Sequence, residues 1–125
     1  PEIRKMARAG RIQFASDGWN ADYPDAENFM QLLYGPNAGQ ENQSRFRLPE
    51  YDRLYQEARK LPDGRERTAI FGKMQELVVA YAPMRFTQHV VEDHAWHARV
   101  KNYRAHPIRQ FSFPYYDVDA SVPGR

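Results

Sequence analysis

The chain has 125 residues, 42% of them hydrophobic, and its 18 Lys and Arg against 16 Asp and Glu give a formal charge of +2. A chain of this length buries one modest core, and its interleaved acids and bases suit solvated helix faces rather than a nucleic-acid surface. The absence of cysteine excludes a disulfide framework and a thiolate metal site, and no run of about 18 apolar residues indicates a membrane span.

The first part of the chain is predicted to form the end of a helix followed by a strand. Residues 1–10, PEIRKMARAG, place apolar side chains at helical spacing, and Gly10 suits the end of the helix. This stretch lacks the apolar region of a signal peptide. Residues 11–16, RIQFAS, alternate apolar and polar side chains, which favours a strand.

Residues 17–29, DGWNADYPDAENF, crowd aromatic rings and carboxylates into a predicted loop. We call this segment the acidic–aromatic loop. An ordinary turn requires neither so many rings nor so many acids, so the segment is a candidate for ligand binding. Asp25 is placed to cap a short helix that carries Phe29, Leu32 and Leu33, and a surface loop rich in Gly, Pro and Asn is predicted after it.

Two longer helices are predicted in the middle of the chain. Residues 49–61 carry one apolar stripe and residues 63–82 carry another, and both are expected to face the core. Asp63 and Glu66 have the spacing of a capping box at the start of the second helix, and Pro83 ends it. The predicted core residues are Tyr51, Leu54, Phe71, Met74 and Leu77.

Extended segments are predicted at residues 83–91 and 110–119, on either side of a stretch whose local structure the pattern does not define. Together with the helices, they indicate alternating helical and extended elements. The predicted fold class is therefore α/β.

Three motifs follow one another in a distinctive order. WNADYPDAENF at residues 19–29 precedes NQSRFRLPEYDRLYQEA at 42–58 and RERTAIFGKMQELVVAYAP at 65–83. In this order they resemble the C-terminal part of the family 5 extracellular solute-binding proteins, the dipeptide, oligopeptide and nickel receptors of ABC importers. The resemblance extends over about residues 9–119, and Ala26 stands where the family usually has a second Pro.

The resemblance implies a C-terminal fragment of a two-lobed, type II periplasmic-binding-protein fold, helix-rich with a few strands. Residues 1–88 would belong to the second lobe, and residues 89–125 would form the hinge crossover and the return segment to the first lobe. The implied function is capture of a peptide or similar small solute in the periplasm for an ABC permease in the membrane. No enzymatic activity, cofactor, metal or nucleic-acid partner is implied. The isolated chain would lack most of the cleft, and it is expected to self-associate through exposed apolar surface.

The resemblance also assigns candidate ligand-binding residues. Asp22 occupies the position of the acid that pairs with a peptide's ammonium group in the family, and Trp19 and Tyr23 would form the walls of the site. Asn20 is at a variable position and would present its amide to the ligand or face solvent, and His89 would face the cleft at the hinge. A carboxylate beside aromatic walls is partly desolvated, which strengthens a charge-assisted hydrogen bond to a cation.

The residues alone leave other interpretations open. Asp22 before Pro24 is typical of a turn, and Trp19 is equally consistent with a core residue at the end of a strand. The acids of the loop also suggest a carbohydrate-binding or glycoside-processing domain, since glycosidases use paired carboxylates. His94 and His97 would share a metal only with a third ligand, which the spacing does not supply.

Overall fold

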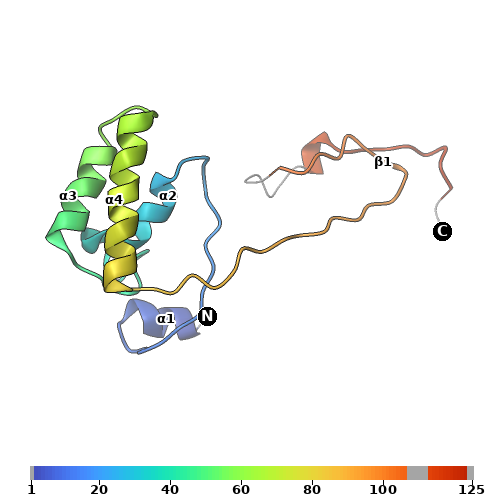
Figure 1. The fold of residues 1–125 in the computed structure, drawn as a ribbon. Coiled ribbons are helices and arrows are strands. Elements are labelled where there is room, and N and C mark those ends of the chain that lie inside the picture. Colours follow the sequence, from blue (N-terminus) through green and yellow to red (C-terminus); the bar gives the residue numbers. More distant parts are fainter. Residues whose placement is uncertain (1, 107–112, 124–125) are drawn as a thin grey trace. The chain divides into compact units, whose positions relative to one another are not determined.

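The chain divides into a helical unit, Pro1–Phe86, and a C-terminal unit, Thr87–Arg125; the computed structural model describes residues 2–106 and 113–123. The helical unit contains α1 (Glu2–Arg8), α2 (Glu27–Met30), α3 (Pro49–Ala58), α4 (Arg65–Tyr81) and the 3-10 helices η1 (Gln31–Leu33) and η2 (Gly35–Asn37) (Figure 1). The C-terminal unit contains β1 (Val100–Lys101), the 3-10 helix η3 (Phe113–Tyr115) and β2 (Asp117–Val118). In these two described ranges, no helix has both the length and the apolar character that crossing a membrane requires.

The core of the helical unit lies mainly between α3 and α4, which run side by side (Figure 1). Its buried side chains are Leu33, Tyr51, Leu54, Tyr55, Ala58, Ile70, Phe71, Met74 and Val78. The predicted core is therefore confirmed at four of its five positions. Leu77 is only partly buried, because it lines an open groove between α3 and α4 among charged side chains such as Glu57 and Lys73.

The ends of the helices test the capping residues predicted from the sequence. α1 ends as predicted: Gly10 has φ +69° and its N–H donates to the Ala7 carbonyl at 2.9 Å. The predicted capping box at α4 is wrong, because Gly64 is the N-cap residue and no side chain caps the helix. Asp63 instead accepts a hydrogen bond from Arg67 at 2.6 Å, one turn further along.

The segment between α2 and α3 is fastened to α3 by polar contacts. Tyr51 donates its hydroxyl to the Met30 carbonyl at 2.9 Å, and the Gly35 N–H donates to the Asp52 carboxylate at 2.7 Å. Asn42 is fully buried, and its amide donates to the backbone carbonyls of Tyr34 and Phe46 at 3.0 and 2.9 Å. These bonds satisfy backbone groups that an irregular segment otherwise leaves unpaired.

The predicted strand at residues 11–16 is wrong, and residues 83–91 form no strand either, since 83–84 are bends and the rest has no regular structure. A strand needs a partner, and the sheet in the described part of the chain is one antiparallel pair, β1 with β2, in which Val100 faces Val118. Of the last predicted extended segment, residues 110–112 lie outside the described residues, Phe113–Tyr115 form the 3-10 helix η3 instead, and Asp117–Val118 form β2. The described part is helix-rich with few strands, as predicted, whereas the two-lobed arrangement and the lobe boundaries stay predictions.

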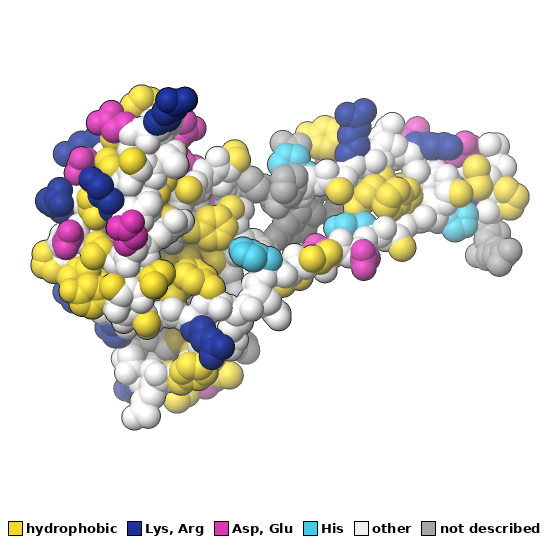
Figure 2. Space-filling model, viewed as in Figure 1, with side chains coloured by type: hydrophobic (Ala, Val, Ile, Leu, Met, Phe, Trp, Pro, Cys, Tyr) yellow, Lys and Arg dark blue, Asp and Glu magenta, His cyan; other side chains and the backbone are white. Residues whose placement is uncertain are grey.

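Large apolar side chains reach the surface of the helical unit, and Figure 2 shows hydrophobic areas between its charged side chains. Phe14 is 91% exposed, Val79 80% and Phe86 77%. Exposed apolar surface of this kind commonly marks a contact with another protein surface. Self-association of the isolated chain stays a prediction, and these side chains are its physical basis.

Candidate functional site

A single buried amide organises the acidic–aromatic loop. Asn28, the second residue of α2, is fully buried, and its Oδ1 accepts hydrogen bonds from Trp19 Nε1 at 2.7 Å and from the Asp22 backbone N–H at 3.1 Å. Its Nδ2 donates to Asp22 Oδ2 at 3.3 Å. The indole ring, the carboxylate and the loop backbone are thus all held by one side chain.

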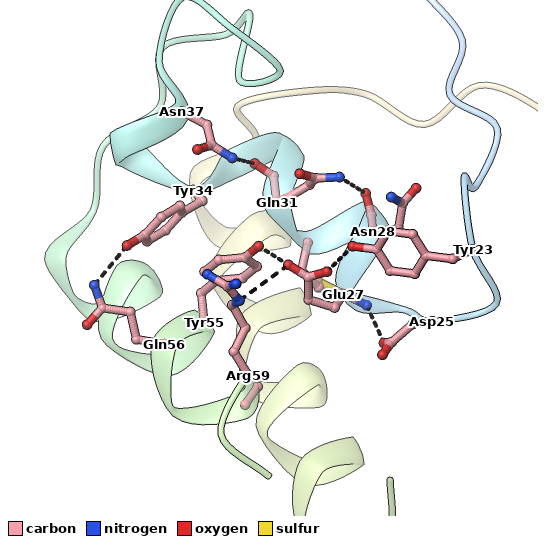
Figure 3. A network of polar contacts seen from close by, with 12 residues as sticks. Tyr23, Asp25, Glu27, Asn28, Gln31, Tyr34, Asn37, Tyr55, Gln56 and Arg59 are labelled. Carbon is pink, nitrogen blue, oxygen red and sulfur yellow. Dashed lines mark hydrogen bonds and ion pairs between the residues drawn. The ribbon is translucent and has the colours of Figure 1, made fainter. Parts of the chain in front are cut away.

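The carboxylate of Glu27 ties the loop to α3 (Figure 3). It accepts hydrogen bonds from the hydroxyls of Tyr23 in the loop and Tyr55 in α3, and the Arg59 guanidinium lies 3.9 Å from it. The Glu27 side chain is only 12% exposed, so these partners replace water around its charge. Burial first, and then the bond to Glu27, raise the pKa of Tyr55 well above its ordinary range. The hydrogen bond to Glu27, followed by burial, also raises the pKa of Tyr23.

Arg67 of α4 anchors the start of α2. Its guanidinium donates to Asp25 Oδ2 at 2.8 Å, and Asp25 Oδ1 accepts the backbone N–H of Glu27 at 2.8 Å. Asp25 therefore supports the start of the short helix, but the predicted cap at Asp25 is wrong, because Ala26 is the N-cap residue of α2. Burial opposes ionisation of Asp25, but the bonds from Arg67 and the Glu27 N–H outweigh it and hold the pKa of that carboxyl below its ordinary value. Arg67 itself is buried, donates to the Ala58 carbonyl at 3.1 Å, and lies over the ring of Phe71.

Three of the predicted site residues come together on the acidic–aromatic loop. Trp19 and Asp22 share the Asn28 amide, and Tyr23 is held by Glu27 beside them. The Asp22 and Tyr23 side chains are exposed, and Trp19 is half-buried. Asn20 is exposed on the same loop. His89 is exposed and belongs to the C-terminal unit, so its part in the site stays a prediction.

Sequence reasoning missed Asn28, Glu27 and Arg67 as organisers of the site. Asn28 and Glu27 lie inside the loop that the sequence singled out, but nothing in their spacing tells which of its polar residues is buried. Arg67 lies 42 residues from its partner Asp25, a distance that no local pattern reveals. Among the described residues, no group of three or more His, Asp or Glu side chains is arranged to hold a metal ion.

Comparison with known proteins places this geometry in context. The chain is 33% identical over 119 residues to heme-binding protein A of Haemophilus influenzae, a match that covers 94% of this chain and 22% of that protein. It is 26% identical over 113 residues to di/tripeptide-binding protein 1 of Pseudomonas aeruginosa, covering 90% and 21% of the two chains. It is 34% identical over 71 residues to the periplasmic oligopeptide-binding protein of H. influenzae, a match that covers 57% of this chain and 13% of that protein. No family model and no solved structure matches the chain.

These relatives belong to one class, the periplasmic solute-binding proteins. The predicted resemblance to the family 5 extracellular solute-binding proteins is thereby confirmed, and the chain spans about a fifth of the length of the first two relatives. All three are named for what they bind, which agrees with a function without catalysis. They give no support to the carbohydrate-binding or glycoside-processing alternative.

Proposed function

We propose that the chain supplies part of the ligand site of a periplasmic solute-binding protein, which captures a peptide or a similar small solute with a free amine. The captured solute passes unchanged to an ABC permease in the membrane. The similarity to proteins named for di/tripeptide and oligopeptide binding supports this proposal. Because the chain spans about a fifth of the relatives' length, the remainder of the ligand site would come from other parts of such a protein.

The observation that carries the proposal is the way the loop presents Asp22. Its carboxylate is exposed, yet one of its oxygens is held by Asn28, and the same amide holds the Trp19 ring. An ammonium group that binds this carboxylate would form a charge-assisted hydrogen bond next to aromatic surface. A contact of this kind recognises the amine and leaves the ligand's side chains free to vary, which suits a transporter of many peptides.

In the two-lobed fold that the resemblance implies, residues 1–88 would lie in the second lobe and residues 89–125 would cross at the hinge and return to the first. Closure of the lobes would bury the ligand and remove water from the ion pair at Asp22. His89 and Asn20 would then contribute polar contacts from the hinge and the loop. The ligand's charge would be met by a fixed group, so no catalytic residue is needed.

The test is calorimetry on the whole protein that contains this chain, with trialanine and N-acetyltrialanine as probes. Asp22→Asn should weaken trialanine binding by about 1.5 to 3 kcal/mol, the scale of a hydrogen bond to a charged group. The acetylated peptide, which has no ammonium group, should bind weakly to both proteins. Asp17→Asn is the matched control, since this exposed acid of the same loop bonds Gly18 and Gln43 and not Asn28.

Two results would contradict the proposal. Trialanine binding that is unchanged by Asp22→Asn would remove Asp22 from the site. Binding of heme with no binding of trialanine would replace the amine-bearing solute by the ligand after which one relative is named. Heme carries carboxylates of its own, so Asp22 would not attract it and Asp22→Asn would not weaken its binding.

A further inference from the structure

We infer that Asn28 is a positioning residue for ligand binding: it sets the direction of the Asp22 carboxylate before a ligand arrives. This inference rests on the proposed role of Asp22 and adds a residue that would not touch the ligand. Asn28 is completely buried, whereas Asp22 is exposed. The two side chains meet through the 3.3 Å bond from Asn28 Nδ2 to Asp22 Oδ2.

The hydrogen bonds of the Asn28 side chain point to this role. They go to residues that precede α2 by several positions: two to Asp22 and one to Trp19. A side chain that served only to stabilise α2 would bond to the helix or its neighbours instead. Asn42 shows the contrast: it is equally buried, but its side-chain bonds in the described part of the chain go to the backbone carbonyls of Tyr34 and Phe46 and to Ser44, none of them a candidate ligand-binding residue.

The two oxygens of the Asp22 carboxylate have different surroundings. Oδ2 is occupied by the Asn28 amide, and in the described part of the chain no hydrogen bond is made to Oδ1. An exposed aspartate normally samples several rotamers, so fixing one of them removes an ordering cost from ligand binding. One oxygen is thus held by the protein and the other is left for the ligand.

The support of α2 is separate from these bonds, so removing the Asn28 amide leaves the helix attached. Asp25 accepts its first N–H and is itself held by Arg67, Glu27 accepts the Tyr55 hydroxyl, and Tyr51 donates to the carbonyl at its end. Asn28→Ala should therefore loosen Asp22 and Trp19 while α2 stays in place. This separation makes a double-mutant cycle informative.

The experiment measures trialanine binding to the whole protein in four forms: unchanged, Asn28→Ala, Asp22→Asn, and both together. Asn28→Ala alone should weaken binding about tenfold, and it should change binding less than about twofold once Asp22 is already Asn. Asn42→Ala is the matched control, and any loss of affinity that it causes should be the same with either residue at position 22. An equal loss from Asn28→Ala in both backgrounds would overturn the inference and leave Asp22 in the site. If Asp22→Asn itself has no effect, the proposed function fails and the inference fails with it.

A second cycle on the 125-residue chain decides the matter if Asn28→Ala does not fold. Asn28→Asp keeps both acceptor bonds but places a second carboxylate against Asp22, so it should lower the unfolding midpoint. Adding Asp22→Asn restores a donor opposite the buried acid and should recover most of that loss. Midpoints that fall equally in both backgrounds would show that the two side chains do not act on each other, which overturns the inference.

Discussion

Removing the Arg67 guanidinium should destabilise the helical unit by about 2 to 4 kcal/mol, the range between one charged hydrogen bond and a broken buried ion pair. Arg67→Met keeps an unbranched apolar side chain at this buried position, and it deletes every polar contact as well as the cation–π contact of the guanidinium with Phe71. Asp25 accounts for most of the loss, since its side chain is 28% exposed and loses its cationic partner. Asp63 is 90% exposed, so its bond contributes little, and the Ala58 carbonyl loses one neutral acceptor contact.

Urea unfolding followed by the helical circular dichroism signal measures this loss, because most of the helix lies in α3 and α4. Arg53→Met is the matched control: Arg53 pairs with Glu57 on the surface of α3, with side chains 64% and 51% exposed, and should cost less than about 0.5 kcal/mol. Equal losses of unfolding free energy in Arg67→Met and Arg53→Met would refute the conclusion that the buried Arg67 stabilises the helical unit by holding Asp25.

The pH dependence of the same experiment has a definite sign. Asp25 has a lower pKa in the folded protein than in the unfolded chain, so its pairing stabilises the fold above the ordinary pKa of aspartate and is lost as the pH falls through the folded value. The difference in free energy of unfolding between the unchanged protein and Arg67→Met should therefore become smaller below about pH 4. A difference in unfolding free energy that stays constant down to pH 2 would show that Asp25 is not the main partner of Arg67.

Three further predictions concern the core, a close backbone approach and the exposed surface. Met74→Ala should cost about 2 to 5 kcal/mol, because Met74 is 0% exposed, whereas Lys73→Ala should cost less than about 0.5; similar costs in urea melts would mean that the buried face of α4 is misassigned. Gly35→Ala places a methyl group 2.5 Å from the Asp52 carboxylate and should destabilise the protein by about 1.5 to 3 kcal/mol. Gly72→Ala meets no atom within 4 Å and should stabilise α4 by about 0.5 to 1 kcal/mol. Thermal melts measure both changes. Light scattering should find the isolated 125-residue chain as a dimer or larger, and a monomer at all concentrations would contradict that expectation.

The long helices were predictable because their signal is periodic and local. α3 and α4 each bury one stripe against the other, and the apolar residues that form the stripes recur at helical spacing in the sequence. Residues 11–16 have equally clear alternation, yet they form no strand among the described residues. The alternation indicates which side chains would lie on each face of a strand. A strand also needs a second strand to pair with, and the local sequence does not show whether another part of the chain supplies one.

The sequence predicted that the candidate site residues of the loop lie together, but it did not predict which side chains hold them, and their role in ligand binding stays a prediction. The density of rings and acids marked the acidic–aromatic loop, and Trp19, Asp22 and Tyr23 do lie together there. The sequence also pointed to Asp25 at the start of α2, where it accepts the Glu27 N–H, but the cap lies one residue later, at Ala26. It did not reveal Asn28, since burial of one amide among several depends on how α2 packs against distant parts of the chain such as α3, and not on its neighbours in the sequence.

The bonds that close the acidic–aromatic loop around Asn28 span nine residues or fewer along the chain. Closing so short a stretch costs little chain entropy, so these bonds shape the loop at small cost once Glu27 and Asp25 hold it to α3 and α4. Exchanges at its exposed positions, such as Asn20, leave both the closing bonds and the α3–α4 core intact. A segment with this property can acquire a new ligand preference through a few substitutions without a loss of stability that would have to be repaired elsewhere.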